Sequence, residues 1–264
     1  MAVRTSRRTD GEGKMSLGQH LLELRKRLFL AAAGIIVGAI IGWFLSEFVW
    51  DALREPVYAI ANAQDRNAQI NYPNITSAFD LKLKIAFYVG LIISSPMWLY
   101  QIFAFLVPGL TRKEKQYTFG FFFSAVPLFF AGCAAGWYVL PHIVELMTSF
   151  APAQDAAFIA AAEYFDFVLK LVLAIGIAFV LPVFIVLLNF AGVISAESIV
   201  KSWRVAILVI VLFTAIATPS ADLVSMFMLA IPMIVLYFTA WGIAWLHDRR
   251  VAKRTLAFTQ ELAL

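Results

Sequence analysis

The sequence has 264 residues and a formal net charge of +4, with 62% hydrophobic and only 14% charged residues. Its mean hydropathy is +0.82, whereas a soluble domain carries roughly a quarter charged residues. This composition excludes an ordinary soluble domain. Because the apolar residues come in long blocks, it predicts an all-α protein that crosses a membrane several times as one compact bundle.

The segment before the first apolar run is polar and basic. No short apolar core with a small-residue cleavage site follows it, so we expect a disordered cytoplasmic leader at residues 1–14 and no cleavable signal peptide. The S-x-x-Q pattern at residues 16–19 predicts the capped start of a helix. On this helix His20, Glu23 and Arg27 form one stripe. Glu23 and Arg27 have the spacing of an i,i+4 ion pair, which is most simply a solvated pair.

Six runs lack Asp, Glu, Lys and Arg, and most exceed the roughly 20 residues that cross the hydrocarbon as a helix. They are Leu28–Ser46, Ile85–Thr111, Gln116–Val144, Leu171–Ala196, Val205–Ala221 and Leu223–His247. Pro219 and Asp222 separate the last two runs, which predicts a tight helical hairpin. The alternative, a single helix of about 42 residues, would be much longer than a bilayer is thick.

Two features of these spans leave alternatives open. The fifth span is short, since the residues 205–217 make only about 20 Å of helix; either it thins the bilayer, or its helix begins within the preceding loop. Prolines inside four spans predict kinks, which either serve a function or only shape the bundle. These prolines are Pro96, Pro127, Pro182 and Pro232.

The distribution of basic residues predicts the orientation. With six spans, sixteen of the 21 lysines and arginines fall on the side of the termini and four on the opposite side. The positive-inside rule then places both termini, including a tail at residues 251–264, in the cytoplasm. The two outer loops, residues 51–80 and 141–166, are longer and lean acidic, and we expect short amphipathic helices and turns there.

Few residues are suited to catalysis. His20, His142 and His247 fall at three different membrane borders and cannot share a metal, and no nucleophile, metal or phosphate-loop motif is present. The sequence therefore predicts neither an enzyme nor a cofactor. Cys133, the one cysteine, lies inside an apolar run and is expected to be a packing residue.

Two other functions remain. A channel or secondary transporter for a small solute would need a polar site at mid-membrane, and the centres of the six spans carry no Asp, Glu, Lys, Arg or His. A scaffold for other membrane helices is favoured by glycines that permit close helix approach. These are Gly132, Gly136, Gly176 and Gly242.

Two carboxylates stand out on the predicted inner face, each surrounded by basic residues. Glu23 lies in HLLELRKR and Glu114 in LTRKEK. Each is, taken alone, part of a topology anchor. Together they suit cationic ligand groups, above all arginine, whose guanidinium meets a carboxylate through two parallel hydrogen bonds.

Four motifs occur in register along the chain: HLLELRKRL, YQIFAFLVPGLTRKEK, FVLPVFIVLLNFAGVIS and ATPSADLVSMFMLAIPM. In order and spacing, over roughly residues 15–250, the chain resembles the TatC subunit of the twin-arginine protein translocase. The resemblance implies a concave, glove-like bundle of six transmembrane helices in a bacterial-type cytoplasmic membrane. It also implies a receptor that binds twin-arginine signal peptides and exports folded proteins using the proton-motive force, without nucleotide hydrolysis. The implied partners are TatA-like and TatB-like single-span subunits in a multi-copy hetero-oligomer, with no role for nucleic acid.

The resemblance also implies roles for individual residues. Signal-peptide binding falls to Glu23, Arg25, Phe105 and Glu114, and structural or partner-docking roles fall to Pro56, Pro108, Thr218, Pro219, Asp222 and Met226. In one respect the chain departs from the family. Many members carry an acidic or amide residue just before the proline of the fourth span, where this chain has Val180 and Leu181.

Overall fold

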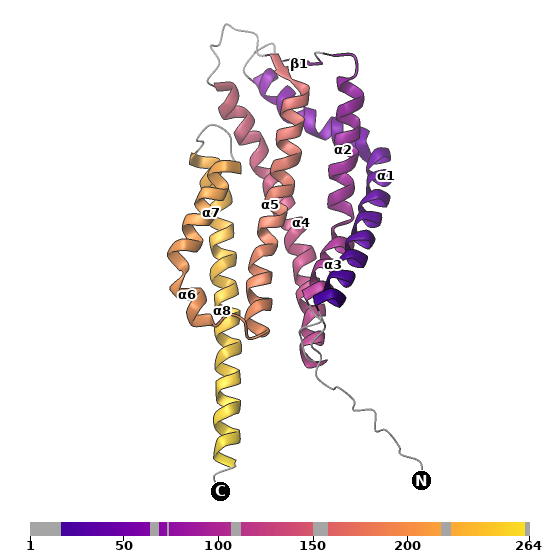
Figure 1. The fold of residues 1–264 in the computed structure, drawn as a ribbon. Helices are drawn as coiled ribbons and strands as arrows, with labels where there is room; N and C mark the ends of the chain where they lie inside the picture. Colours follow the sequence, from indigo (N-terminus) through magenta and orange to yellow (C-terminus); the bar gives the residue numbers. More distant parts are fainter. Residues whose placement is uncertain are drawn as a thin grey trace, which may run out of the picture.

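The computed structural model describes residues 17–63, 69–72, 74–106, 112–149, 158–217 and 223–261. The predicted leader, residues 1–14, lies outside them, as does Ser16 of the predicted capping box. The helices are α1 (Leu17–Ala63), α2 (Ser77–Ile93), α3 (Ser95–Leu106), α4 (Arg112–Ser149), α5 (Ala161–Phe190), α6 (Ala196–Lys201), α7 (Trp203–Ala217) and α8 (Leu223–Glu261). The strands are β1 (Gln69–Asn71) and β2 (Phe158–Ala160). The chain is therefore nearly all-helical, as the composition predicts, and its long helices lie side by side and run alternately in opposite directions (Figure 1).

The apolar helices follow the predicted spans closely. In the described part, α1, α4, α5 and α8 are long and apolar enough to cross a membrane, and the bent pair α2–α3 makes a fifth candidate. The helix α7 has 15 residues, or about 22 Å at 1.5 Å per residue. Because α6 ends at Lys201 and α7 begins at Trp203, helical structure begins well before Val205. This agrees with the interpretation that the fifth span starts within the preceding loop.

A break at Ser94 divides the second predicted span. The axes of α2 and α3 differ by 54° across it. Pro96 is the second residue of α3 and lacks the N–H that would continue the ladder of α2. The Leu91 carbonyl at the break accepts hydrogen bonds from the Trp98 indole (2.9 Å) and the Ser94 hydroxyl (3.3 Å). The kink expected at Pro96 is thus confirmed. The other three prolines lie inside α4, α5 and α8 without ending them.

The prediction of short helices and turns for the first outer loop was wrong in its first half. The helix α1 continues unbroken to Ala63, at the end of the molecule where α2 and α5 begin, here called the far end (Figure 1). The Tyr164 hydroxyl on α5 donates to the Leu53 carbonyl of this extension over 3.0 Å and is buried. The two outer loops also meet in a parallel pairing of β1 with β2, which the all-helical prediction did not contain.

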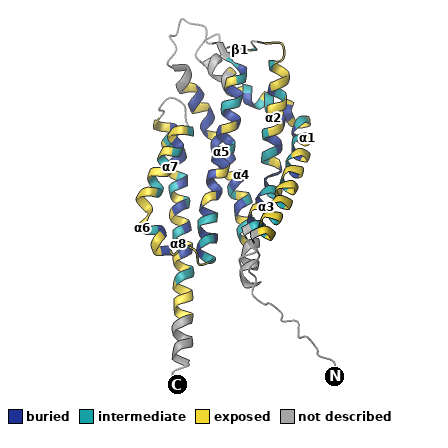
Figure 2. Cartoon of the chain, in the orientation of Figure 1, coloured by how far each residue is buried: buried dark blue, intermediate teal, exposed yellow. Residues whose placement is uncertain are grey.

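The core is centred on α5, which buries residues around much of its circumference (Figure 2). Small residues bring helices together at two contacts. A Cβ added at Gly90 of α2 would overlap the Ala39 backbone of α1, and one added at Gly132 of α4 would meet the Ile175 carbonyl of α5 at 2.8 Å. The close approach expected of Gly132, Gly136 and Gly176 is thus confirmed. A Cβ added at Gly242 would meet nothing within 4 Å, so close approach of another membrane helix at this position stays a prediction.

Candidate functional site

The start of α1, the end of α3, the start of α4 and the end of α8 lie toward one end of the bundle, opposite the far end (Figure 1). We call it the basic end, because most described lysines and arginines lie on these segments and on the neighbouring α6 and α7. They are Arg25, Lys26, Arg27, Arg112, Lys113, Lys115, Lys201, Arg204, Arg249, Arg250, Lys253 and Arg254. The start of α1 and the end of α8 thus lie at the same end of the bundle, while the cytoplasmic location of both termini remains a prediction.

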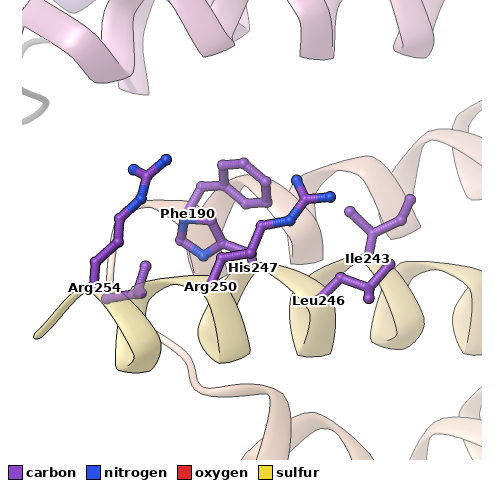
Figure 3. A pocket seen from close by; sticks show the side chains of 7 residues that line it. Phe190, Ile243, Leu246, His247, Arg250 and Arg254 are labelled. Carbon is purple, nitrogen blue, oxygen red and sulfur yellow. The ribbon is translucent and has the colours of Figure 1, made fainter. Parts of the chain in front are cut away.

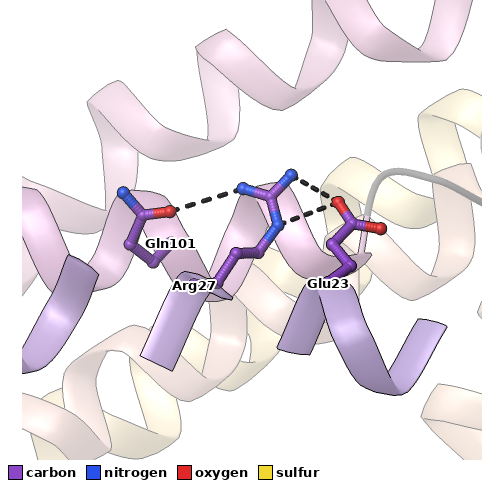
Figure 4. A network of polar contacts seen from close by, with 3 residues as sticks. All are labelled: Glu23, Arg27 and Gln101. Atoms are coloured by element: carbon purple, nitrogen blue, oxygen red, sulfur yellow. Dashed lines mark hydrogen bonds and ion pairs between the residues drawn. The ribbon is translucent and has the colours of Figure 1, made fainter. Parts of the chain in front are cut away.

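Glu23 lies in a polar network at this end (Figure 4). Its Oε1 accepts hydrogen bonds from Arg27 Nε (2.9 Å) and Nη2 (2.6 Å), and Arg27 Nη1 donates to Gln101 Oε1 of α3 over 3.4 Å. The predicted i,i+4 pair is therefore confirmed. It is half-buried, with side-chain exposures of 20% for Glu23 and 24% for Arg27. The second oxygen, Glu23 Oε2, is buried and has no hydrogen-bond partner among the described residues.

An aromatic pair also joins the start of α1 to the end of α3. The ring of His20, three residues before Glu23 and on the same helical stripe, stacks on the ring of Phe105 from α3, with centroids 4.3 Å apart and an angle of 18° between the planes. The end of α3 thus contributes both Phe105 and Gln101 to one face of α1. Arg25 is exposed and lies outside this network.

The remaining predicted residues are placed only in part. Glu114 lies in the first turn of α4, at the basic end, and Pro56 lies in the extension of α1, but the side chains of both are outside the described part. Met226 is half-buried in the first turns of α8. Pro108, Thr218, Pro219 and Asp222 lie outside the described residues.

Comparison with known proteins identifies this arrangement. Residues 19–232 match the family model described as Sec-independent protein translocase protein (TatC). The TatC protein of Xylanimonas cellulosilytica is 43% identical over 92% of this chain and 88% of its own length. That of Rothia mucilaginosa is 36% identical over 97% of this chain and 87% of its own length. The chain belongs to the TatC family.

A solved structure of the family agrees with the fold. A crystal structure of the twin-arginine translocase receptor TatC in DDM superimposes with a TM-score of 0.73 at 29% identity, covering 85% of this chain and 99% of that one. The resemblance drawn from the four sequence motifs is therefore confirmed. As a TatC protein, this chain is a membrane-spanning component of a protein translocase.

The departure from the family pattern in the fourth span has a clear location. Val180 is 2% exposed and packs inside the core, whereas Leu181 is 53% exposed and faces away from it. A polar side chain at position 181 would therefore lie on the surface of α5, within its apolar stretch. In this TatC protein that surface is apolar.

Sequence reasoning missed two polar groups at the basic end. Gln101 is the one amide in its apolar run, and this would have singled it out as a partner for the Glu23–Arg27 pair. Asp248 directly follows the last apolar run, and its position alone marks no role. Its carboxylate accepts from Asn189 Nδ2 (3.0 Å) and from the backbone N–H of Ala196 (2.8 Å), and so joins α8 to the turn between α5 and α6.

Proposed function

We propose that this TatC protein is the receptor subunit of a twin-arginine translocase. It binds twin-arginine signal peptides at the basic end and exports folded proteins across a bacterial-type cytoplasmic membrane, driven by the proton-motive force. Both termini lie in the cytoplasm. TatA-like and TatB-like single-span subunits join it in a multi-copy hetero-oligomer, with their docking surface around Thr218, Pro219, Asp222 and Met226.

The observation that carries this proposal is the unpartnered oxygen of Glu23. A buried carboxylate oxygen without a donor is costly, and a charged donor that reaches it recovers a strong hydrogen bond. Arg27 occupies only Oε1. An arginine of the signal peptide is the donor expected at Oε2, and the stacked rings of His20 and Phe105 offer an aromatic surface to its aliphatic stem.

The second arginine of the signal is assigned to Glu114. Its place in the first turn of α4 puts it at the same end of the bundle as Glu23. The basic residues around both acids repel cations in general, so binding depends on guanidinium geometry and not on bulk charge. This disfavours peptides that carry lysines in place of the arginine pair.

The test is peptide binding to the full chain in nanodiscs. Glu23→Gln and Glu114→Gln keep side-chain size and remove the charge, and each is expected to lower the affinity for a twin-arginine peptide by about tenfold or more. Glu197→Gln is the matched control, since Glu197 is an exposed acid on α6 at the same end. A twin-lysine peptide is expected to bind weakly to every variant. Unchanged affinity in both Glu23→Gln and Glu114→Gln would refute the proposal, and it would favour a scaffold that binds only partner helices.

A further inference from the structure

An apolar groove lies between α4, α5 and α8, away from the Glu23 network. Its volume is about 500 Å³, within the range of small-molecule sites. The wall from α5 includes Val183 and Val186, which are buried, and the wall from α8 includes Leu236 and Ile243. Leu128 of α4 completes it.

The groove offers few free polar groups. Its two lining hydroxyls are engaged within their own helices, because Ser124 Oγ donates to the Gly120 carbonyl (2.9 Å) and Thr239 Oγ1 donates to the Val235 carbonyl (2.7 Å). A polar ligand would therefore lose its hydration without compensation here. A hydrocarbon chain makes no hydrogen bonds with water and would therefore enter the groove without this cost.

A second, smaller pocket of about 210 Å³ continues the groove toward the basic end and shares Phe190 and Ile243 with it. The ring of His247 stacks on that of Phe190, with centroids 3.9 Å apart. The guanidinium groups of Arg250 and Arg254 stand at the same side of α8 as this stack (Figure 3). The apolar groove thus ends at Arg250 and Arg254, which we call the cationic mouth.

The charge of this mouth is not neutralised within the described part of the chain. Arg250 and Arg254 are one helical turn apart, so their like charges repel each other. No ion pair to either is found among the described residues, where the neighbouring carboxylate of Asp248 is engaged by Asn189 and Ala196. Arg249, by contrast, lies over the Trp245 ring at 5.2 Å, outside the pocket lining.

We propose that groove and mouth together bind one anionic membrane phospholipid. Its phosphate lies between Arg250 and Arg254, whose forked guanidinium groups match phosphate oxygens, and one acyl chain lies along Val183, Val186 and Ile243. The arginines of a signal peptide would be repelled by this mouth. A neutral partner helix would leave the two cations unpaired. This site does not depend on the proposed signal-peptide site.

Native mass spectrometry of the purified full chain, with phosphatidylglycerol and phosphatidylcholine offered in equal amounts, tests the site. Wild-type protein is expected to retain phosphatidylglycerol preferentially. Each arginine near the phosphate is expected to strengthen binding about fivefold. The Arg250→Gln/Arg254→Gln variant is therefore expected to retain phosphatidylglycerol about 30-fold more weakly. Arg249→Gln/Lys253→Gln removes the same charge from the neighbouring stripe of α8 and is expected to behave as wild type. Ile243→Trp, which narrows the groove, is expected to lose retention with both arginines intact, and far-ultraviolet circular dichroism checks its fold.

A photo-cross-linker at Ile243 identifies the occupant in native membranes. An adduct with the mass of an anionic phospholipid is the expected product. A peptide adduct in its place would overturn the proposal in favour of a signal peptide or partner helix. Equal loss of lipid from both double-arginine and control variants would also overturn it, because it would show attraction to the whole basic end and not to this site.

Discussion

Arg27 binds one oxygen of Glu23 and leaves the other without a hydrogen-bond donor among the described residues. The Arg27 Nη2 atom lies 2.6 Å from Glu23 Oε1, while Glu23 Oε2 is buried without a partner among the described residues. An ion pair that served only stability would be expected to engage both oxygens in a fork. The one-sided contact orients the carboxylate and leaves Oε2 without a donor among the described residues.

This geometry predicts that the pair contributes little to stability. In a double-mutant cycle with Glu23→Gln and Arg27→Gln, we expect a coupling energy of at most about 1 kcal/mol, as for other partly exposed i,i+4 pairs. Reversible unfolding in mixed micelles measures it. A coupling of several kcal/mol would contradict the prediction and would make Glu23 chiefly a structural residue.

Hydropathy predicted the helices of the fold that are apolar, and it did not predict the parts outside the apolar runs. Each of the six charge-free runs overlaps an apolar helix or, for the second run, the bent pair α2–α3. Hydropathy marks these helices because the hydrocarbon excludes Asp, Glu, Lys and Arg. The extension of α1 to Ala63 was missed because the helix leaves the apolar region there, and its residues are fixed by contacts such as Tyr164 with Leu53. The pairing of β1 with β2 joins three-residue segments far apart in the chain, which no local pattern marks.

Close packing of α1 on α2 gives a second prediction. A Cβ at Gly90 would overlap the Ala39 backbone, so Gly90→Ala is expected to destabilise the protein by about 1–3 kcal/mol. Gly242→Ala is the matched control. Since nothing lies within 4 Å of its added Cβ, we expect no loss of stability and a gain of up to about 1 kcal/mol from helix propensity. Thermal unfolding in nanodiscs compares them, and equal destabilisation by both changes would refute the packing argument.

The far end provides a third prediction. Tyr164→Phe removes the buried hydrogen bond to the Leu53 carbonyl and is expected to cost about 1 kcal/mol. It is also expected to raise hydrogen exchange in residues 47–63 of α1, because this bond fixes the extension to α5. Tyr138→Phe is the control, as Tyr138 is 73% exposed on α4. Unchanged exchange in the Tyr164→Phe variant would show that the extension is held by other contacts.

From the charge pattern, only the acidic residues that are surrounded by basic residues could be predicted to belong to the candidate site. That pattern marked Glu23 and Glu114, and family resemblance added Phe105. The partners that define the geometry were not marked, because Gln101 and Asp248 act through distant helices: Gln101 meets α1 from α3, and Asp248 meets the turn after α5 from α8. Which distant helices meet at the basic end is set by three-dimensional packing, and local charge patterns do not encode it.

The junction held by Asp248 gives the last prediction. Gly192 lies two residues after the end of α5 and has a φ of +71°. Asn189 Nδ2 donates to both the Ile194 carbonyl (2.9 Å) and Asp248 Oδ1. Asp248→Asn keeps the size of the side chain but turns one acceptor into a donor. Because both partners of Asp248 are N–H groups, one of them would then face another donor. We expect a loss of about 1–3 kcal/mol in stability.

Hydrogen exchange resolved along the chain tests where this loss occurs. Exchange is expected to rise between residues 191 and 201 and at the end of α8, and to stay unchanged in α1 and α2, which do not contact the junction through Asp248. Asp248→Glu is the informative second variant: it keeps two acceptor oxygens on a longer stem and is expected to recover part of the protection. Protection equal to wild type in Asp248→Asn would show that the α5–α6 turn is fixed by Gly192 and the Tyr237–Ile199 hydrogen bond without the carboxylate.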